Sequence, residues 1–167
     1  MKLSLLIIAL LIFLFACQSN NTKKKRIQAK HSTESPGTVT NIVDGDTFDM
    51  ADINGNIIRI RPIGINTDEM HDNSHGKKGP FAQQAKDYLT QLIYNKQVRL
   101  EMDIQKKDKW KRILAYVFVD DSLFVNAEMV KQGLAVIETE PPNVKYADYF
   151  YQLQQQARGA GLGMWKQ

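Results

Sequence analysis

Short runs of alternating hydrophobic and polar residues predict β-strands across the middle of the chain. Successive side chains of a strand point to opposite faces, so alternation indicates a sheet with one buried face. The turn-forming sequences Asp44-Gly45-Asp46 and Asn54-Gly55-Asn56 separate the first three runs. The last run is almost continuously apolar, which is typical of a strand buried on both faces. We expect five strands, over residues 38–43, 47–50, 57–65, 97–102 and 113–119.

Three segments show helical periodicity instead. Phe81, Ala85, Leu89 and Ile93 recur every four residues after Pro80, which predicts an amphipathic helix over residues 80–94. Asn126 is a suitable N-cap for a short helix that ends at Gly133. A last helix is expected after Pro141-Pro142-Asn143, ending at Gly159 to Gly161, with this apolar stripe: Tyr146, Tyr149, Phe150, Leu153 and Ala157.

The order of these elements predicts the fold class. One helix lies between the third and fourth strands, and two helices follow the fifth. This order fits an α+β fold, a five-stranded Greek-key β-barrel of the OB type with three helices. OB barrels are frequent scaffolds for nucleic acids and oligosaccharides.

The segment before the strands has a different character. Residues 5–16 form an uninterrupted apolar run of 12 residues, which suits the core of a signal peptide and is short for a transmembrane helix. Leu14-Phe15-Ala16-Cys17 resembles a bacterial lipobox, and Cys17 is the single cysteine of the chain. We therefore expect lipidation at Cys17 and export to the cell envelope with a lipid anchor in a bacterial membrane. An uncleaved signal anchor, or a soluble protein cut nearby, remains an alternative.

The domain organisation follows from these observations. Residues 18–36 are polar and include Lys23-Lys24-Lys25-Arg26, so they have little to bury. We expect a signal peptide over residues 1–16, a lipidated polar tether over 17–36 and the barrel domain over 37–167.

Composition and charge narrow the possibilities only slightly. The chain has 167 residues, 43% of them hydrophobic and 24% charged, which indicates one ordinary globular domain rather than a disordered or fibrous protein. Its formal net charge of +4 favours phosphates, acidic polymers or anionic lipids as partners. The single cysteine excludes a disulfide framework within the chain.

Three segments carry residues suited to phosphodiester chemistry, which requires charge neutralisation at phosphorus and a positioned water. The first is the turn around Gly45, whose two carboxylates suit a hard cation, although such turns are more often structural. The second runs from Arg61 to Glu69; Arg59, two positions earlier on the same face, is a competing candidate. The third is the basic loop 108–112, which is equally compatible with a solvated surface loop.

In this order and spacing, the three segments resemble the thermonuclease (staphylococcal nuclease) family, and the resemblance extends from about Val39 to Trp165. It implies a calcium ion (Ca²⁺), a water positioned or deprotonated by Glu69, and a phosphate clamp formed by Arg61 and Arg112. The implied metal ligands and their support are Asp46, Asn66 and the Thr67 carbonyl, with Asp44 behind the turn rather than on the metal.

The chain departs from the family pattern at three places. Asn66 stands where the family usually has aspartate, which predicts weaker calcium binding because a neutral amide oxygen replaces a charged ligand. Asp68 replaces a proline, so it can restore the charge or make the turn that carries Glu69 more flexible. Residues 138–141, Glu-Thr-Glu-Pro, do not match a tyrosine-bearing loop that contacts nucleotides in the family.

Further basic and aromatic residues are candidates for contacting the nucleic-acid backbone: Lys77, Lys78, Lys109 and Trp110. His71 and His75 lack a third histidine or cysteine nearby and are interpreted as loop residues. We expect a monomeric, exported, lipid-anchored nuclease acting on DNA and/or RNA. The alternatives are a lipid-anchored OB module that binds nucleic acid without catalysis, and a cell-surface interaction domain that does not depend on calcium.

Overall fold

The computed structural model describes residues 34–69, 79–120 and 122–166, with the side chains of Glu34 and Ser35 excepted. The expected signal peptide, Cys17, most of the expected tether, and Lys77, Lys78, His71 and His75 lie outside these residues. Among the described helices, none has the length and apolar character needed to cross a membrane. The fold below is that of the second compact unit, residues 33–167.

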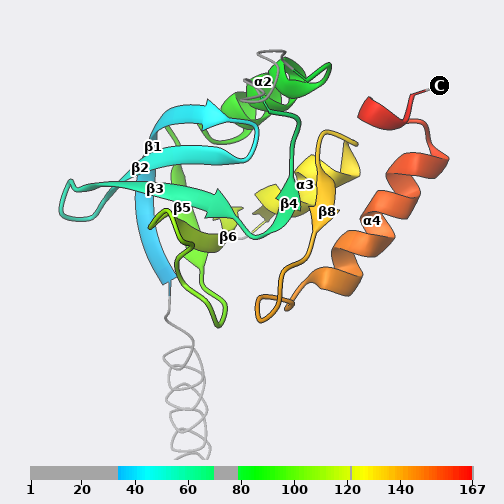
Figure 1. The fold of residues 1–167 in the computed structure, drawn as a ribbon. Coiled ribbons are helices and arrows are strands. Elements are labelled where there is room, and N and C mark those ends of the chain that lie inside the picture. The colour runs from blue at the N-terminus through cyan, green and yellow to red at the C-terminus, as the bar shows by residue number, and fades with distance from the viewer. Residues whose placement is uncertain (1–33, 70–78, 121, 167) are drawn as a thin grey trace, which may run out of the picture. The chain divides into compact units, whose positions relative to one another are not determined.

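Five strands form a closed barrel, as the sequence predicted (Figure 1). Neighbouring strands are antiparallel in the order β3-β2-β1-β5-β6, and a parallel pairing of β3 with β6 closes the barrel, with Arg61 opposite Leu114. The OB-fold prediction is therefore confirmed. The barrel strands are β1 (Glu34–Asp44), β2 (Thr47–Asp52), β3 (Ile57–Pro62), β5 (Gln97–Glu101) and β6 (Ile113–Val119).

The alternating pattern fills the barrel interior as expected. In β5, Val98 and Leu100 are buried, whereas Gln97, Arg99 and Glu101 keep some exposure. The strands contribute an apolar core with no exposed surface at several large side chains, and this burial is the main stabilising contribution to the fold. Its largest members include Phe48, Met50, Ile60, Leu100 and Tyr116.

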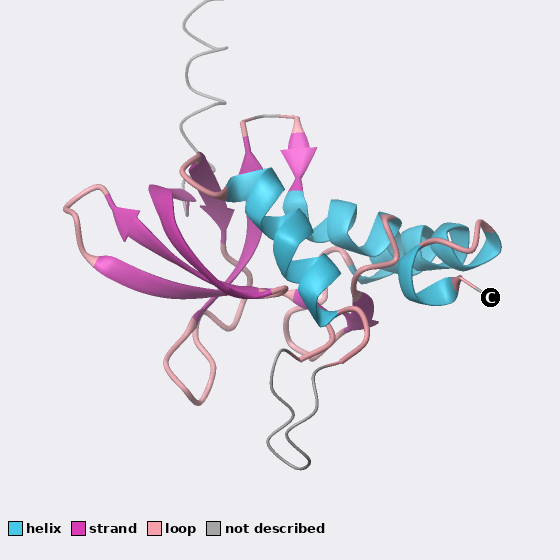
Figure 2. Ribbon diagram, turned by 90° about the horizontal axis from the view of Figure 1, so that it is seen from above, coloured by secondary structure: helices cyan, strands magenta, loops and turns pink. Residues whose placement is uncertain are grey.

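The helices cover one end and one side of the barrel, and Figure 2 shows the strands grouped together with the helices over and beside them. They are α2 (Ala82–Ile93), α3 (Val125–Lys131), α4 (Ala147–Gly159) and a 3₁₀ turn, η1 (Gly163–Trp165). The four-residue spacing in α2 is confirmed, since Ala85, Leu89 and Ile93 are fully buried.

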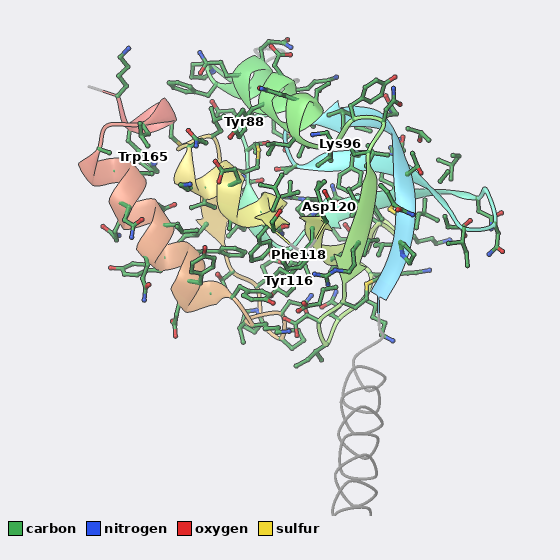
Figure 3. The ribbon with its side chains drawn as sticks, turned by 180° about the vertical axis from the view of Figure 1, so that it is seen from behind. Tyr88, Lys96, Tyr116, Phe118, Asp120 and Trp165 are labelled. Carbon is green, nitrogen blue, oxygen red and sulfur yellow. The ribbon has the colours of Figure 1, made fainter. Side chains whose placement is uncertain are left out.

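Aromatic residues join α4 to the barrel. Tyr116 of β6, labelled in Figure 3, packs edge-on against Tyr146, the residue before α4, with ring centroids 4.6 Å apart. Phe124, which stacks on Phe118 of β6 at 4.5 Å, also lies 4.9 Å from Tyr146. Phe150 is buried, but Tyr149 of the predicted stripe is 47% exposed. The stripe on α4 is therefore narrower than the sequence suggested.

Two strand boundaries differ from the prediction. β1 begins at Glu34, so residues 34–36, which the sequence assigned to the tether, pair with Arg99 to Glu101 of β5. The pairing is made by the backbone, so it does not require the apolar side chains by which a strand is recognised in the sequence. The run 57–65 is broken after Pro62, because Gly64 has a φ of +80° that turns the chain into the short strand β4 (Gly64–Asn66).

Two very short strands were not predicted. β7 (Leu123–Phe124) pairs with β6, and β8 (Val136–Glu138) pairs with β4 in a separate two-stranded sheet. Two or three residues are too few for an alternating pattern to be recognised. β8 matters for the site, because it brings the chain after α3 alongside Asn66.

The prediction that Asn126 caps α3 is wrong. The helix begins at Val125, and Asn126 is completely buried inside it. Its amide accepts a hydrogen bond from the Val117 amide and donates one to the Ile63 carbonyl, both at 2.9 Å. Asn126 therefore fixes α3 to β6 and to the chain that leads into β4.

Candidate active site

A pocket of about 720 Å³ lies where β3 and β6 close the barrel. It is lined by most of the candidates that the sequence indicated, although they are far apart in the chain: Asp44, Asp46, Arg61, Asn66, Glu69, Trp110 and Arg112. Thr67 and Lys109 do not line the pocket but contact residues that do. Among the described residues, these candidates therefore converge on one pocket.

Asp46 joins the β1–β2 turn to the end of β4. Its Oδ2 accepts hydrogen bonds from the Thr67 amide at 2.8 Å and the Thr67 hydroxyl at 3.1 Å, and its Oδ1 accepts one from the Thr47 hydroxyl at 3.2 Å. The close approach requires Gly45, because a Cβ there would lie 2.7 Å from Thr67 Oγ1. The glycine of this turn therefore permits the contact between the two segments.

Arg61 is held at the base of the pocket with only 12% of its side chain exposed. Nη1 donates to the Ile65 carbonyl at 2.9 Å and lies 3.1 Å from Asp46 Oδ2. Nη2 donates to Asn66 Oδ1 at 3.0 Å and to Glu138 Oε2 at 3.3 Å. The guanidinium plane is therefore fixed before any ligand arrives.

Arg59 is the weaker of the two arginine candidates in β3. It forms a two-pronged pair with Asp49, with Nε 2.8 Å from Oδ1 and Nη2 3.1 Å from Oδ2. This pair lowers the pKa of Asp49 chiefly through the hydrogen bond from Arg59. Although Arg59 reaches the pocket wall, its charge is matched by an acid that is not part of the site.

Arg112 enters the pocket from the loop before β6. Asp108 orients it, because Oδ2 accepts from Arg112 Nε at 2.6 Å while Oδ1 accepts from the backbone amides of Trp110 and Arg112. Arg112 Nη1 lies 3.5 Å from the Thr47 hydroxyl, next to Asp46, which Arg61 contacts. The two arginines therefore contact two consecutive residues, Asp46 and Thr47.

Three carboxylates, those of Asp44, Asp46 and Glu69, line the pocket near these arginines. Burial raises the pKa of Glu69, and the negative charges of Asp44 and Asp46 raise it further, as does a hydrogen bond with Asp44; Arg61 partly opposes the effect. Asp44 also accepts a hydrogen bond from the Gly45 amide at 2.8 Å. The local excess of negative charge would be relieved by a bound cation.

The oxygen atoms here suit a hard cation, provided that backbone carbonyls or water also act as ligands. Within residues 34–69, 79–120 and 122–166, no group of three or more Asp, Glu, His or Cys side chains is arranged to hold a metal. An ion would therefore need neutral oxygens as well, such as the Asn66 amide or the Thr67 carbonyl. Ca²⁺ accepts such mixed carboxylate, carbonyl and water shells.

The outer rim carries an aromatic side chain beside two cations. Trp110 is 65% exposed, with Lys109 Nζ 4.3 Å and Arg112 Cζ 4.9 Å from its ring centroid. Such a platform can stack a nucleobase while the cations attract phosphate. Both residues that the sequence proposed in this loop are therefore found beside the pocket.

Sequence reasoning missed two residues that control the arginines. Asp108 stands four positions before Arg112, but residues 108–112 form a loop, where this spacing does not by itself indicate an ion pair. Glu138 contacts Arg61 from β8, and no local pattern in the sequence connects these distant residues.

The fold and the pocket define an OB-type barrel with an arginine-rich, acid-rimmed site over its closing strands. The model of the family described as "Staphylococcal nuclease homologue" matches residues 59–167, and the chain belongs to this family. The thermonuclease of Staphylococcus intermedius is 36% identical over 140 residues, covering 82% of each chain. The thermonuclease of Staphylococcus hyicus is 29% identical over 163 residues, covering 98% of this chain and 95% of the relative. An SPbeta prophage-derived endonuclease of Bacillus subtilis is 34% identical over 130 residues, 77% of this chain and 43% of that protein.

Proposed function

We propose that this protein is a calcium-dependent nuclease that hydrolyses phosphodiester bonds of DNA and/or RNA. The observation that carries the proposal is the convergence of Arg61, Arg112 and Glu69 in one pocket. Membership of the staphylococcal nuclease family and similarity to proteins named thermonuclease and endonuclease support the same activity.

The two arginines would bind the phosphate undergoing attack. A guanidinium presents planar paired donors that match phosphoryl oxygens, and a fixed donor costs little reorganisation when charge builds up there. Arg61 is fixed by the Ile65 carbonyl and Asn66, and Arg112 by Asp108. Each arginine therefore acts from a prepared position.

Glu69 would orient the attacking water and accept its proton. A carboxylate is a better base when its proton affinity is raised, and burial, the largest cause, raises the pKa of Glu69. The positive charge of Arg61 lowers the pKa of Glu69 and so partly opposes this effect.

Calcium would be held by Asp46, Asn66 and the Thr67 carbonyl, with Asp44 supporting the turn. Bound there, the ion would supply positive charge to neutralise the phosphoryl oxygens. Asp46 is already anchored through Thr67, so the same contacts that fix the turn would fix the ion's ligands. The amide of Asn66 in place of a carboxylate predicts modest affinity.

Binding along the nucleic acid would involve Trp110 and Lys109 at the outer rim, and Lys77 and Lys78 remain candidates outside the described residues. Export and a lipid anchor at Cys17 are part of the proposal, supported by the hydrophobic segment and the lipobox-like sequence. The protein is proposed to act as a monomer.

Digestion of single-stranded DNA, double-stranded DNA and RNA tests the proposal. We expect cleavage with calcium and none with a chelator. Glu69→Gln should lower the rate by about 10²- to 10⁴-fold, the usual contribution of a general base. Glu101→Gln is a matched control, because Glu101 bonds Tyr146 and does not line the pocket. Binding without cleavage in every condition would instead support a non-catalytic binding module.

A further inference from the structure

Glu138 brings a negative charge to the binding face of Arg61. The segment Glu138-Thr139-Glu140 places two exposed acidic residues on the lining of a pocket otherwise suited to anions. Their negative charges repel a phosphate, so phosphate binding does not explain their position.

Each Nη atom of Arg61 already contacts two residues in this structure. Nη1 contacts the Ile65 carbonyl and Asp46, and Nη2 contacts Asn66 and Glu138. Each Nη carries two hydrogens, so an incoming phosphate must replace one of these partners to use an Nη donor.

Glu138 is the partner that an anion would replace. Its contact with Arg61 Nη2 is 3.3 Å, longer than the contacts at 2.9 Å to Ile65, 3.0 Å to Asn66 and 3.1 Å to Asp46 Oδ2. A longer contact, at 3.4 Å, joins Nη1 to the backbone carbonyl of Asp46, which cannot move aside as an exposed side chain can. Its side chain is 48% exposed, so water can receive it when it leaves, whereas the Asp46 side chain is only 7% exposed. Exchanging one oxyanion for another also leaves Arg61 with a charged partner.

The backbone keeps Glu138 beside Arg61. β8 pairs with β4 through Gly64 opposite Glu138, and the Ile137 amide donates to the buried Gln154 at 2.9 Å. The carboxylate therefore remains near Arg61 after displacement and can return when the phosphate leaves.

We propose that Glu138 is a positioning residue that holds Arg61 in the free protein and competes with the substrate phosphate for it. This inference rests on the proposed nuclease function. The competition weakens substrate binding, so Glu138 raises KM. It does not change the rate of the chemical step, because Arg61 has exchanged partners both in the enzyme–substrate complex and in the transition state. The same competition speeds product release, because the carboxylate replaces the departing phosphate.

The test compares Glu138→Gln with Glu140→Gln in the full-length protein. Both changes remove one negative charge from the pocket rim and keep the side-chain shape, but only Glu138 contacts Arg61. An exposed ion pair is worth up to about 1 kcal/mol, or roughly fivefold in binding. We expect Glu138→Gln to lower KM for a single-stranded oligonucleotide by about two- to fivefold, and Glu140→Gln to lower it by clearly less, since its charge acts only through screened solvent.

A binding measurement separates this inference from the nuclease proposal. Fluorescence anisotropy of a labelled single-stranded DNA without added calcium gives Kd in a Glu69→Gln background, independently of cleavage. Glu138→Gln should tighten Kd by the same factor, and adding Arg61→Gln should abolish that gain, as a double-mutant cycle requires for a direct contact.

Each outcome is decisive. A tighter Kd without any cleavage by the wild-type protein would reject the nuclease and retain the competition. Normal cleavage with equal effects of the two glutamine variants, or with no effect of either, would overturn the competition. A fall in the unfolding midpoint of Glu138→Gln with unchanged Kd would show a purely structural ion pair and would also overturn it, as would a failure of all variants to bind DNA.

Discussion

Asn126 offers a direct test of how the site is attached to the fold. Replacing it with alanine removes the acceptor for the Val117 amide and the donor to the Ile63 carbonyl. Asn126 has no solvent exposure, so water does not take over either bond without entering the core. A buried polar group left unsatisfied costs about 1–3 kcal/mol. Two such groups, partly relieved by relaxation or an entering water, give an expected loss of about 3 kcal/mol.

Urea unfolding followed by tryptophan fluorescence measures this loss. In a separate thermal melt, at about 3 °C per kcal/mol for a domain of this size, the melting temperature should fall by roughly 10 °C. Asn41→Ala is the matched control, because Asn41 is exposed and only donates to Asp49 at 3.1 Å; its loss should be about 0.5 kcal/mol. A loss at Asn126 no larger than at Asn41 would refute the reasoning that these two bonds hold α3, β6 and the entry to β4 together.

Two further predictions concern the strands beside the pocket. Gly64→Ala should destabilise the protein by about 1–3 kcal/mol, because φ is +80° and a Cβ would lie 2.7 Å from Phe150. Gly159→Ala should not destabilise it, because nothing lies within 4 Å of a Cβ there. Equal melting temperatures of the two variants would contradict the strain argument. For Asp49, the hydrogen bond from Arg59 lowers the pKa below its ordinary 3.8, so this contribution to stability is complete above that pH and is lost as pH falls through the lowered pKa. The stability difference between wild type and Asp49→Asn should therefore shrink in acid, and a pH-independent difference in urea titrations would count against the pair.

The barrel could be predicted because its strands carry their own evidence. Runs such as 97–102 alternate, and turn residues separate the first three strands. Local patterns of this kind depend on neighbours in sequence. The helix α2 was predictable for the same reason, since its spacing and its burial agree.

The missing features all depend on contacts between distant residues. Asn126 has the chemistry of a helix cap, yet two buried partners outside α3 decide its position. β8 has three residues, and only its pairing with β4 identifies it as a strand. The contact of Glu138 with Arg61 follows from that pairing and therefore could not be foreseen.

The candidate site was foreseen in its members but not in their contacts. The turn at Asp46, the segment ending at Glu69 and the loop at Arg112 were recognised from motif order, and the pocket unites them. The strand alone does not show which arginine of β3 belongs to the site. Asp49, which does not line the pocket, pairs with Arg59 from the neighbouring strand.

The parallel pairing of β3 with β6 also determines when the phosphate clamp can form. Arg61 lies in β3 and Arg112 directly precedes β6, so the two arginines of the clamp are brought together only when these two strands pair. Under the proposed function, an unfinished or unfolded chain is thus inert toward nucleic acid, and catalytic competence arises in the same event that completes the barrel.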